Sequence, residues 1–291
     1  VLFLAGGATT QFAQVPLNLA APARQGAYIV NGSWSKKAFS TAQRMGFARL
    51  AASSEDTGFK SIPAKDEWDL EGAPAYLHYA INETISGVQF RQPPETDLPL
   101  VSDMSSDILS RPLDINKFGV IYAGAQKNIG QAGLALVIVR KDLLQDLPDT
   151  QPDLQSWKIQ HKQGSRLNTP PTYAWYIAGL VFEWVEAMGG VEQMAQLNEE
   201  KSDTLYRYLD QSSFYLNGIP PQYRSHMNIP FQIVDESLHP QFVAEAEAAG
   251  LSSLKGHRSV GGMRASIYNA MPIEGIQALI SFMKDFERKA G

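Results

Sequence analysis

One lysine of this sequence lies in a glycine-rich turn between two apolar runs. Residues 120–123 predict a buried strand, and residues 134–139, which begin directly after Gly133, predict a second one; Lys127 falls between them. A lysine held against a core is costly unless its charge is neutralised or used. Its amine becomes a nucleophile when it loses a proton, and capture of an aldehyde is one recurring use. The alternative is an ordinary surface lysine on a hairpin turn, and this stretch alone leaves both interpretations open.

Two more polar side chains follow predicted strands. Residues 75–80 and 98–102 predict strands, and Thr84 and Asp103 come after them. Ligands of open α/β sheets bind outside the carboxyl ends of the strands, so a hydroxyl, a carboxylate and the amine of Lys127 converge there if the strands are parallel neighbours. Each residue could instead cap a helix or stabilise a turn, as Asp103 could for the serines that follow it. Three such residues in succession favour a site.

Small residues and one tryptophan suggest where a flat, phosphorylated ligand could bind. Residues 6–10 follow a first strand at residues 1–4 and precede a helix that we expect from Gln11 to Pro16. Free backbone N–H groups at such a helix start suit a phosphate, although glycine pairs mark turns everywhere. Trp34 follows a strand at residues 26–30 and could stack on a ring; the alternative is a core tryptophan.

The remaining pattern predicts an α/β protein with a mainly parallel sheet and a smaller layer at the end. Residues 35–51 are predicted as one helix, and further helices are expected at residues 173–188, 191–209, 240–249 and 273–289. Strands at residues 231–234 and 264–268 give the last third a βαβ-like character. We therefore expect a large domain of residues 1–187 and a small C-terminal domain of residues 188–291.

Composition excludes several classes of protein. The 291 residues carry 25 basic and 30 acidic side chains in a mixed pattern, with a net charge of −5, which argues against nucleic acid or an anionic membrane as a partner. Cysteine is absent, so no disulfide or thiolate chemistry is expected, and a cytoplasmic location is consistent with that. The five histidines lack zinc-ligand spacing, so no metal site is expected.

Two arginines and a histidine near the end of the chain suit anions. Arg258 and Arg264 lie beside glycine turns, and His257 precedes the first of them. Guanidinium groups match carboxylates and phosphates, whereas most arginines form ordinary surface ion pairs. His257 is expected to help rather than to bind a metal.

These motifs together resemble a known family. The sequence Gly-Ala-Gln-Lys-Asn-Ile-Gly at residues 124–130, Asn-Glu-Thr-Ile at residues 82–85, Asn-Thr-Pro-Pro at residues 168–171 and Gly-His-Arg at residues 256–258 occur in the order found in phosphoserine aminotransferases. These are class V aminotransferases, of the fold type I group of pyridoxal-phosphate enzymes. The resemblance covers essentially the whole chain. It departs at Gln131, where the family usually has proline, and we expect an N-terminal segment of the family to be missing.

The resemblance implies a role for each candidate residue. Lys127 would bind the cofactor covalently and move the substrate proton, and Asp103 would pair with the ring nitrogen. The other implied cofactor contacts are Trp34 on the ring, Thr84 at the ring hydroxyl, Ala8, Thr9 and Gln126 at the phosphate, and Asn168 and Thr169 at the phosphate of the partner subunit. His257, Arg258 and Arg264 would bind substrate anions, with Arg264 at the α-carboxylate. A homodimer with shared sites is therefore expected.

The implied reaction is transamination between glutamate and 3-phosphohydroxypyruvate, which belongs to serine biosynthesis. The related 4-phosphohydroxythreonine of pyridoxine biosynthesis is a further possible substrate. Two alternatives stay open: an aminotransferase that uses alanine or serine with glyoxylate, and a truncated, non-catalytic fragment that binds the cofactor. A cysteine desulfurase is disfavoured, since its chemistry needs a cysteine.

Overall fold

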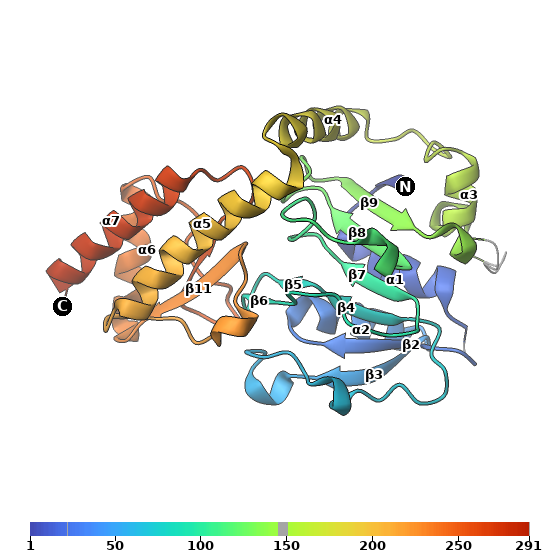
Figure 1. Cartoon of the computed structure of the whole chain (residues 1–291), viewed down its shortest axis with the longest axis horizontal. Helices are drawn as coiled ribbons and strands as arrows, with labels where there is room; N and C mark the ends of the chain where they lie inside the picture. Colours follow the sequence, from blue (N-terminus) through green and yellow to red (C-terminus); the bar gives the residue numbers. More distant parts are fainter. Residues whose placement is uncertain (22, 145–150, 291) are drawn as a thin grey trace.

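A computed structural model describes residues 1–21, 23–144 and 151–290 (Figure 1). Its first part is built on a seven-stranded sheet in the order β1-β9-β8-β7-β4-β2-β3. The strands are β1 (Leu2–Ala5), β2 (Gly26–Val30), β3 (Ala48–Ser53), β4 (Leu77–Ala80), β7 (Leu100–Asp103), β8 (Val120–Gly124) and β9 (Leu134–Val139). The pairs from β3 to β8 are parallel, while β9 pairs antiparallel with both β8 and β1. The predicted α/β class with a mainly parallel sheet is confirmed.

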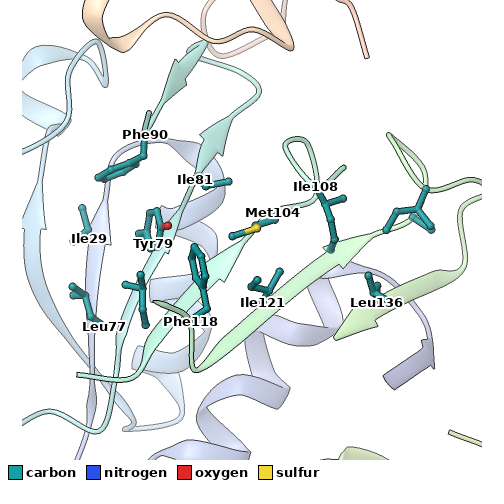
Figure 2. Close-up of a cluster of buried hydrophobic side chains, with 14 of the residues drawn as sticks. Ile29, Leu77, Tyr79, Ile81, Phe90, Met104, Ile108, Phe118, Ile121 and Leu136 are labelled. Carbon is teal, nitrogen blue, oxygen red and sulfur yellow. The ribbon is translucent and has the colours of Figure 1, made fainter. Parts of the chain in front are cut away.

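Helices cover both faces of this sheet. The helices α1 (Ala8–Leu19), α2 (Ser33–Arg44) and α3 (Trp157–Lys162) share one buried cluster with alternate strand residues such as Tyr28 and Tyr122. The opposite strand residues, among them Ile29 and Ile121, pack with α4 (Thr172–Ala187) and the loops in a second cluster, part of which Figure 2 shows. Burial of the sheet on both faces accounts for the continuous apolar runs in the sequence.

Two sequence predictions in this part were wrong. Residues 35–51 form no single helix: α2 ends at Arg44, and β3 follows after Gly46, whose φ of +79° breaks the helix. Pairing of β3 with β2 overrides the helical preference of its alanines and leucine. The first helix also continues past Pro16 to Leu19, because its buried face holds it in spite of the missing N–H.

The second part begins with a long helix and has its own core (Figure 1). Its elements are α5 (Gly190–Gln211), β10 (Tyr215–Leu216), β11 (Asn228–Ile233), α6 (His239–Ala248), β12 (Met263–Ser266) and α7 (Ile273–Ala290). The expected βαβ-like arrangement was wrong, since β11 pairs antiparallel with β12. A tight loop, in which Gly256 N donates to Gly262 O, reverses the chain once more before β12. The division at residue 187 stays a prediction, which the separate core supports.

Candidate active site

The strand order brings three predicted site residues to one edge of the sheet. β4, β7 and β8 are parallel neighbours, so the segments that follow them meet where the strands end. Asp103 is the last residue of β7, and Lys127 lies in the turn between β8 and β9. Thr84 follows β5 (Asn82–Glu83), which forms a short hairpin with β6 (Val88–Gln89) directly after β4. The sequence did not predict this hairpin.

Asp103 is a buried carboxylate beside Lys127. Only 8% of it is exposed, and its Oδ1 accepts hydrogen bonds from Ser105 N at 2.9 Å and Ser105 Oγ at 2.6 Å. The Ser105 hydroxyl in turn accepts from Gly124 N at 3.0 Å, which ties this carboxylate to the lysine-bearing turn. Burial raises the pKa of Asp103, and the Ser105 bonds and the Lys127 charge oppose that rise. Asp103 therefore does stabilise the turn at Ser105, which was the alternative role for this residue. That role does not prevent Asp103 from belonging to a site.

Lys127 has the surroundings of a reactive amine. Burial lowers its pKa, the carboxylates of Asp103 and Glu83 oppose this, and the guanidinium of Arg264 adds to it. Its Nζ lies 5.8 Å from the centre of the Trp34 ring. A lowered pKa increases the fraction of unprotonated, nucleophilic amine at neutral pH.

Trp34 and Thr84 are held together at the start of α2. The indole Nε1 of Trp34 donates to Thr84 Oγ1 at 2.8 Å, and Trp34 N donates to Glu83 Oε2 at 3.0 Å. Arg264 reaches the same place from β12, since its Nη1 donates to Thr84 O at 3.1 Å. Sequence reasoning gave no role to Glu83, although it stands in the Asn-Glu-Thr-Ile motif; its partners lie 48 and 49 residues earlier in the chain.

A place suited to an anion lies at the start of α1. Gly7 precedes this helix without a side-chain cap, and Thr10 N donates to Gly7 O, which leaves the N–H groups of Ala8 and Thr9 available. A Cβ built on Gly124 would lie 2.6 Å from Gln126 Oε1 and 3.3 Å from Ala8 N. Glycine at position 124 therefore lets the Gln126 side chain come close to this strand end beside Ala8 N, and the N–H groups of Ala8 and Thr9 at the start of α1 suit a phosphate.

The other candidates fall into two groups. Exposed His257 and Arg258 line one side of a cleft of about 580 Å³, and Thr9, Lys36 and Lys37 line the other. Asn168 and Thr169 are exposed in the segment before α4. Among the hydrogen bonds of the described residues, none joins Asn168 or Thr169 to the groups around Lys127. One chain thus gathers Trp34, Thr84, Asp103, Lys127 and Arg264 in one place, while His257 and Arg258 line the cleft that Thr9 also borders.

Comparison with known proteins identifies the family. The model of the family "Aminotransferase class-V" matches residues 1–279. The phosphoserine aminotransferase of Hahella chejuensis is 55% identical over 287 residues, which are 98% of this chain and 80% of the relative. That of Pseudomonas aeruginosa (strain LESB58) is 54% identical over 292 residues, or 100% of this chain and 81% of the relative.

Solved structures agree with these relatives. Phosphoserine aminotransferase from Bacillus circulans subsp. alkalophilus has a TM-score of 0.97 at 45% identity, covering 100% of this chain and 81% of that chain. The pyridoxal-phosphate-bound enzyme from Trichomonas vaginalis has a TM-score of 0.90 at 40% identity, covering 97% of this chain and 81% of that chain. The chain therefore belongs to the class-V aminotransferases and, within them, to the phosphoserine aminotransferases.

Proposed function

We propose that this chain is a pyridoxal-phosphate-dependent enzyme that moves an amino group from glutamate to 3-phosphohydroxypyruvate, giving O-phospho-L-serine and 2-oxoglutarate. The observation that carries this proposal is the position of a buried carboxylate, Asp103, and an amine of lowered pKa, Lys127, at the carboxyl ends of the neighbouring parallel strands β7 and β8. Its membership of the phosphoserine aminotransferases supports the choice of substrates. The reaction is a step of serine biosynthesis.

The residues present fit pyridoxal phosphate. The start of α1 at Ala8, with Gln126 close by, suits the phosphate, and Thr9 lines the neighbouring cleft. We propose that Asp103 pairs with the ring nitrogen, that Trp34 stacks on the ring and that Thr84 contacts the ring hydroxyl. When bound, this cofactor withdraws electrons from the α-carbon of an attached amino acid.

Lys127, Asp103 and Arg264 have different proposed roles. Lys127 would hold the cofactor through its amine and would serve as the base that moves the proton of the substrate α-carbon. Asp103 would keep a proton on the ring nitrogen, because a negative charge interacts more strongly with a nearby positive charge in a buried environment than in water. Arg264, fixed against Thr84 O at 3.1 Å, is placed to bind the substrate α-carboxylate.

The cleft beside the site supports a phosphorylated substrate. Its lining includes the basic residues Lys36, Lys37, Arg44, His257 and Arg258, and no aspartate or glutamate is among the described residues that line it. A positive cleft raises the local concentration of dianions. We propose that His257 and Arg258 bind the phosphate end of the substrate.

The test follows the two halves of the reaction separately. The full chain is loaded with pyridoxal phosphate and treated with glutamate, and 2-oxoglutarate is measured; 3-phosphohydroxypyruvate is then added and phosphoserine is measured. We expect both products, and Arg258→Gln should raise the KM for the phosphorylated substrate more than that for glutamate. Faster turnover of alanine with glyoxylate would support the alternative aminotransferase. Cofactor binding without either product would identify a non-catalytic fragment. Activity with 4-phosphohydroxythreonine is measured in the same assay.

A second copy of the chain completes the proposed site. α4 presents exposed apolar side chains at helical spacing, namely Tyr173, Tyr176, Leu180 and Trp184, and exposed Met188 follows its last residue. Asn168 and Thr169 lead directly into this helix. Because a partner that covers α4 also meets these two residues, we propose a homodimer in which they contact the partner's cofactor phosphate. A cytoplasmic location stays a prediction from composition.

Mixing two inactive chains tests the dimer. Lys127→Ala destroys the lysine of its own site, and Asn168→Ala/Thr169→Ala weakens the phosphate contacts of the partner's site. A mixed dimer would then contain one intact and one doubly damaged site, so activity should return on mixing. If mixed dimers form without activity, the shared site is wrong. If the chain stays monomeric, α4 has a different partner.

A further inference from the structure

Glu83 is a buried carboxylate aimed at the first turn of α2. It is fully buried, with 0% exposure. Its Oε2 accepts from Trp34 N at 3.0 Å, and its Oε1 accepts from Ser35 N and Ser35 Oγ, both at 2.7 Å. The first N–H groups of a helix lack partners within the helix and form its positive end. Glu83 therefore fixes the turn that carries Trp34.

The surrounding residues are shaped for this carboxylate. A Cβ built on Gly32 would lie 2.3 Å from Glu83 Cδ and 2.6 Å from its Oε2, so only glycine allows the approach. Thr84, the next residue, accepts from the indole Nε1 of Trp34 at 2.8 Å. Two consecutive residues thus hold Trp34 by its backbone N–H and by its ring N–H.

The hydrogen bonds also affect which protonation state of Glu83 is favoured. Both of its oxygens accept from backbone N–H groups, and such bonds favour the ionised form of a carboxyl group. Burial raises its pKa, and the bonds from Ser35 and Trp34 oppose that rise. The charged groups that act on Lys127 are Asp103 and Glu83, which raise its pKa, and Arg264, which lowers it together with burial.

We propose that Glu83 is a positioning residue of this site: it holds Trp34 at the cofactor ring through the start of α2, and through this contact its carboxylate lies near Lys127, whose Nζ is 5.8 Å from the centre of the Trp34 ring. The inference rests on the proposed roles of Trp34 and Lys127. It adds a residue that touches neither the cofactor nor the substrate in the roles assigned above.

The first readout is cofactor affinity in the full chain, titrated with pyridoxal phosphate. In Glu83→Gln the amide must turn its NH₂ group toward one of the helix donors, so at least one charge-assisted bond is lost. We expect affinity to fall about tenfold, the equivalent of one such bond. Gly32→Ala should reduce affinity similarly, because its methyl displaces the carboxylate. Glu55→Gln, which removes the exposed partner of Lys36, is the matched control and should change nothing.

The second readout separates a charge effect from loosening of α2. The ionisation midpoint of Lys127 is measured in the cofactor-free chain, by competitive acetylation across pH followed by mass spectrometry. Loss of the Glu83 charge should lower the midpoint in Glu83→Gln, and Glu83→Asp should restore part of it. A purely structural role would admit water and move the midpoint up, toward the ordinary value of 10.5.

The outcomes are distinct. An unchanged or raised ionisation midpoint of Lys127 in Glu83→Gln would overturn the inference, and so would wild-type cofactor affinity in Gly32→Ala. If Glu83→Gln does not fold, the affinity of Gly32→Ala is the deciding result. If pyridoxal phosphate fails to protect Lys127 of the wild type from acetylation, the proposed function itself is contradicted instead.

Discussion

Replacement of Asp103 by asparagine should separate stability from function. The amide oxygen can keep both hydrogen bonds from Ser105, while the buried charge is removed. Burial raises the pKa of this carboxyl, so its charge is unfavourable in the cofactor-free protein. We expect the free energy of unfolding of cofactor-free Asp103→Asn to equal or exceed that of the wild type, by up to about 1 kcal/mol.

Cofactor binding should change in the opposite direction. The amide NH₂ replaces an acceptor with a donor at the position proposed for the protonated ring nitrogen. A hydrogen bond to a charged group contributes about 1.5–3 kcal/mol, so pyridoxal phosphate should bind roughly 10–100-fold more weakly. Transamination should fall by several orders of magnitude, because the ring nitrogen is no longer kept protonated.

Asp107 provides the matched control. It is also fully buried and lies four residues away, but Arg111 pairs with it, with Nη2 to Oδ2 at 3.1 Å and Nε to Oδ2 at 3.2 Å. Asp107→Asn leaves the half-buried guanidinium without its counter-charge and should cost about 3–5 kcal/mol. Urea unfolding of both variants and a cofactor titration of Asp103→Asn measure these effects. If Asp103→Asn destabilises the chain as much as Asp107→Asn, the reasoning is refuted.

Three further outcomes are expected. Gly124→Ala should weaken pyridoxal phosphate binding with little loss of stability, because its methyl would push the Gln126 side chain away from Ala8 N; unchanged affinity in a titration would argue against a phosphate contact of Gln126. Lys201 is buried against the carbonyls of Ile267 and Tyr268, and burial lowers its pKa to about 8. Between pH 8 and 10.5, the ordinary pKa of lysine, the unfolded chain binds more protons at Lys201 than the folded chain does. The free energy of unfolding of the wild type should therefore rise with pH relative to that of Lys201→Met, by at most about 1.4 kcal/mol per pH unit. Equal pH dependence of the two chains in urea unfolding would contradict this. By the same linkage, the raised pKa of Asp103 should make the stability of the cofactor-free wild type fall as pH rises above the ordinary value of 3.8, a slope that Asp103→Asn should lessen.

Local signals were enough to predict the elements around Lys127. The apolar runs of β8 and β9 and the glycine turn between them lie within 20 residues of sequence, and the structure places them as predicted. The segment of β3 failed because its alanines favour helix, and only pairing with β2 makes it a strand. The secondary-structure propensities of its residues carry no information about that pairing.

The candidate site shows the same limit. Thr84 and Asp103 could be proposed because they follow predicted strands, but only the structure shows that β4, β7 and β8 are parallel neighbours. Glu83 could not be assigned a role, since the helix donors that it meets come from α2, far earlier in the chain. The position of Arg264 against Thr84 O likewise depends on how the second part packs on the first.

The most direct test of the central claim is to identify the lysine that binds the cofactor. The full chain is incubated with pyridoxal phosphate, reduced with borohydride and digested, and the modified peptide is sequenced by mass spectrometry. We predict that the cofactor is attached to Lys127, and that prior addition of glutamate removes most of this label. Attachment to a different lysine, or a label that glutamate leaves unchanged, would contradict the assignment of Lys127 as the catalytic amine.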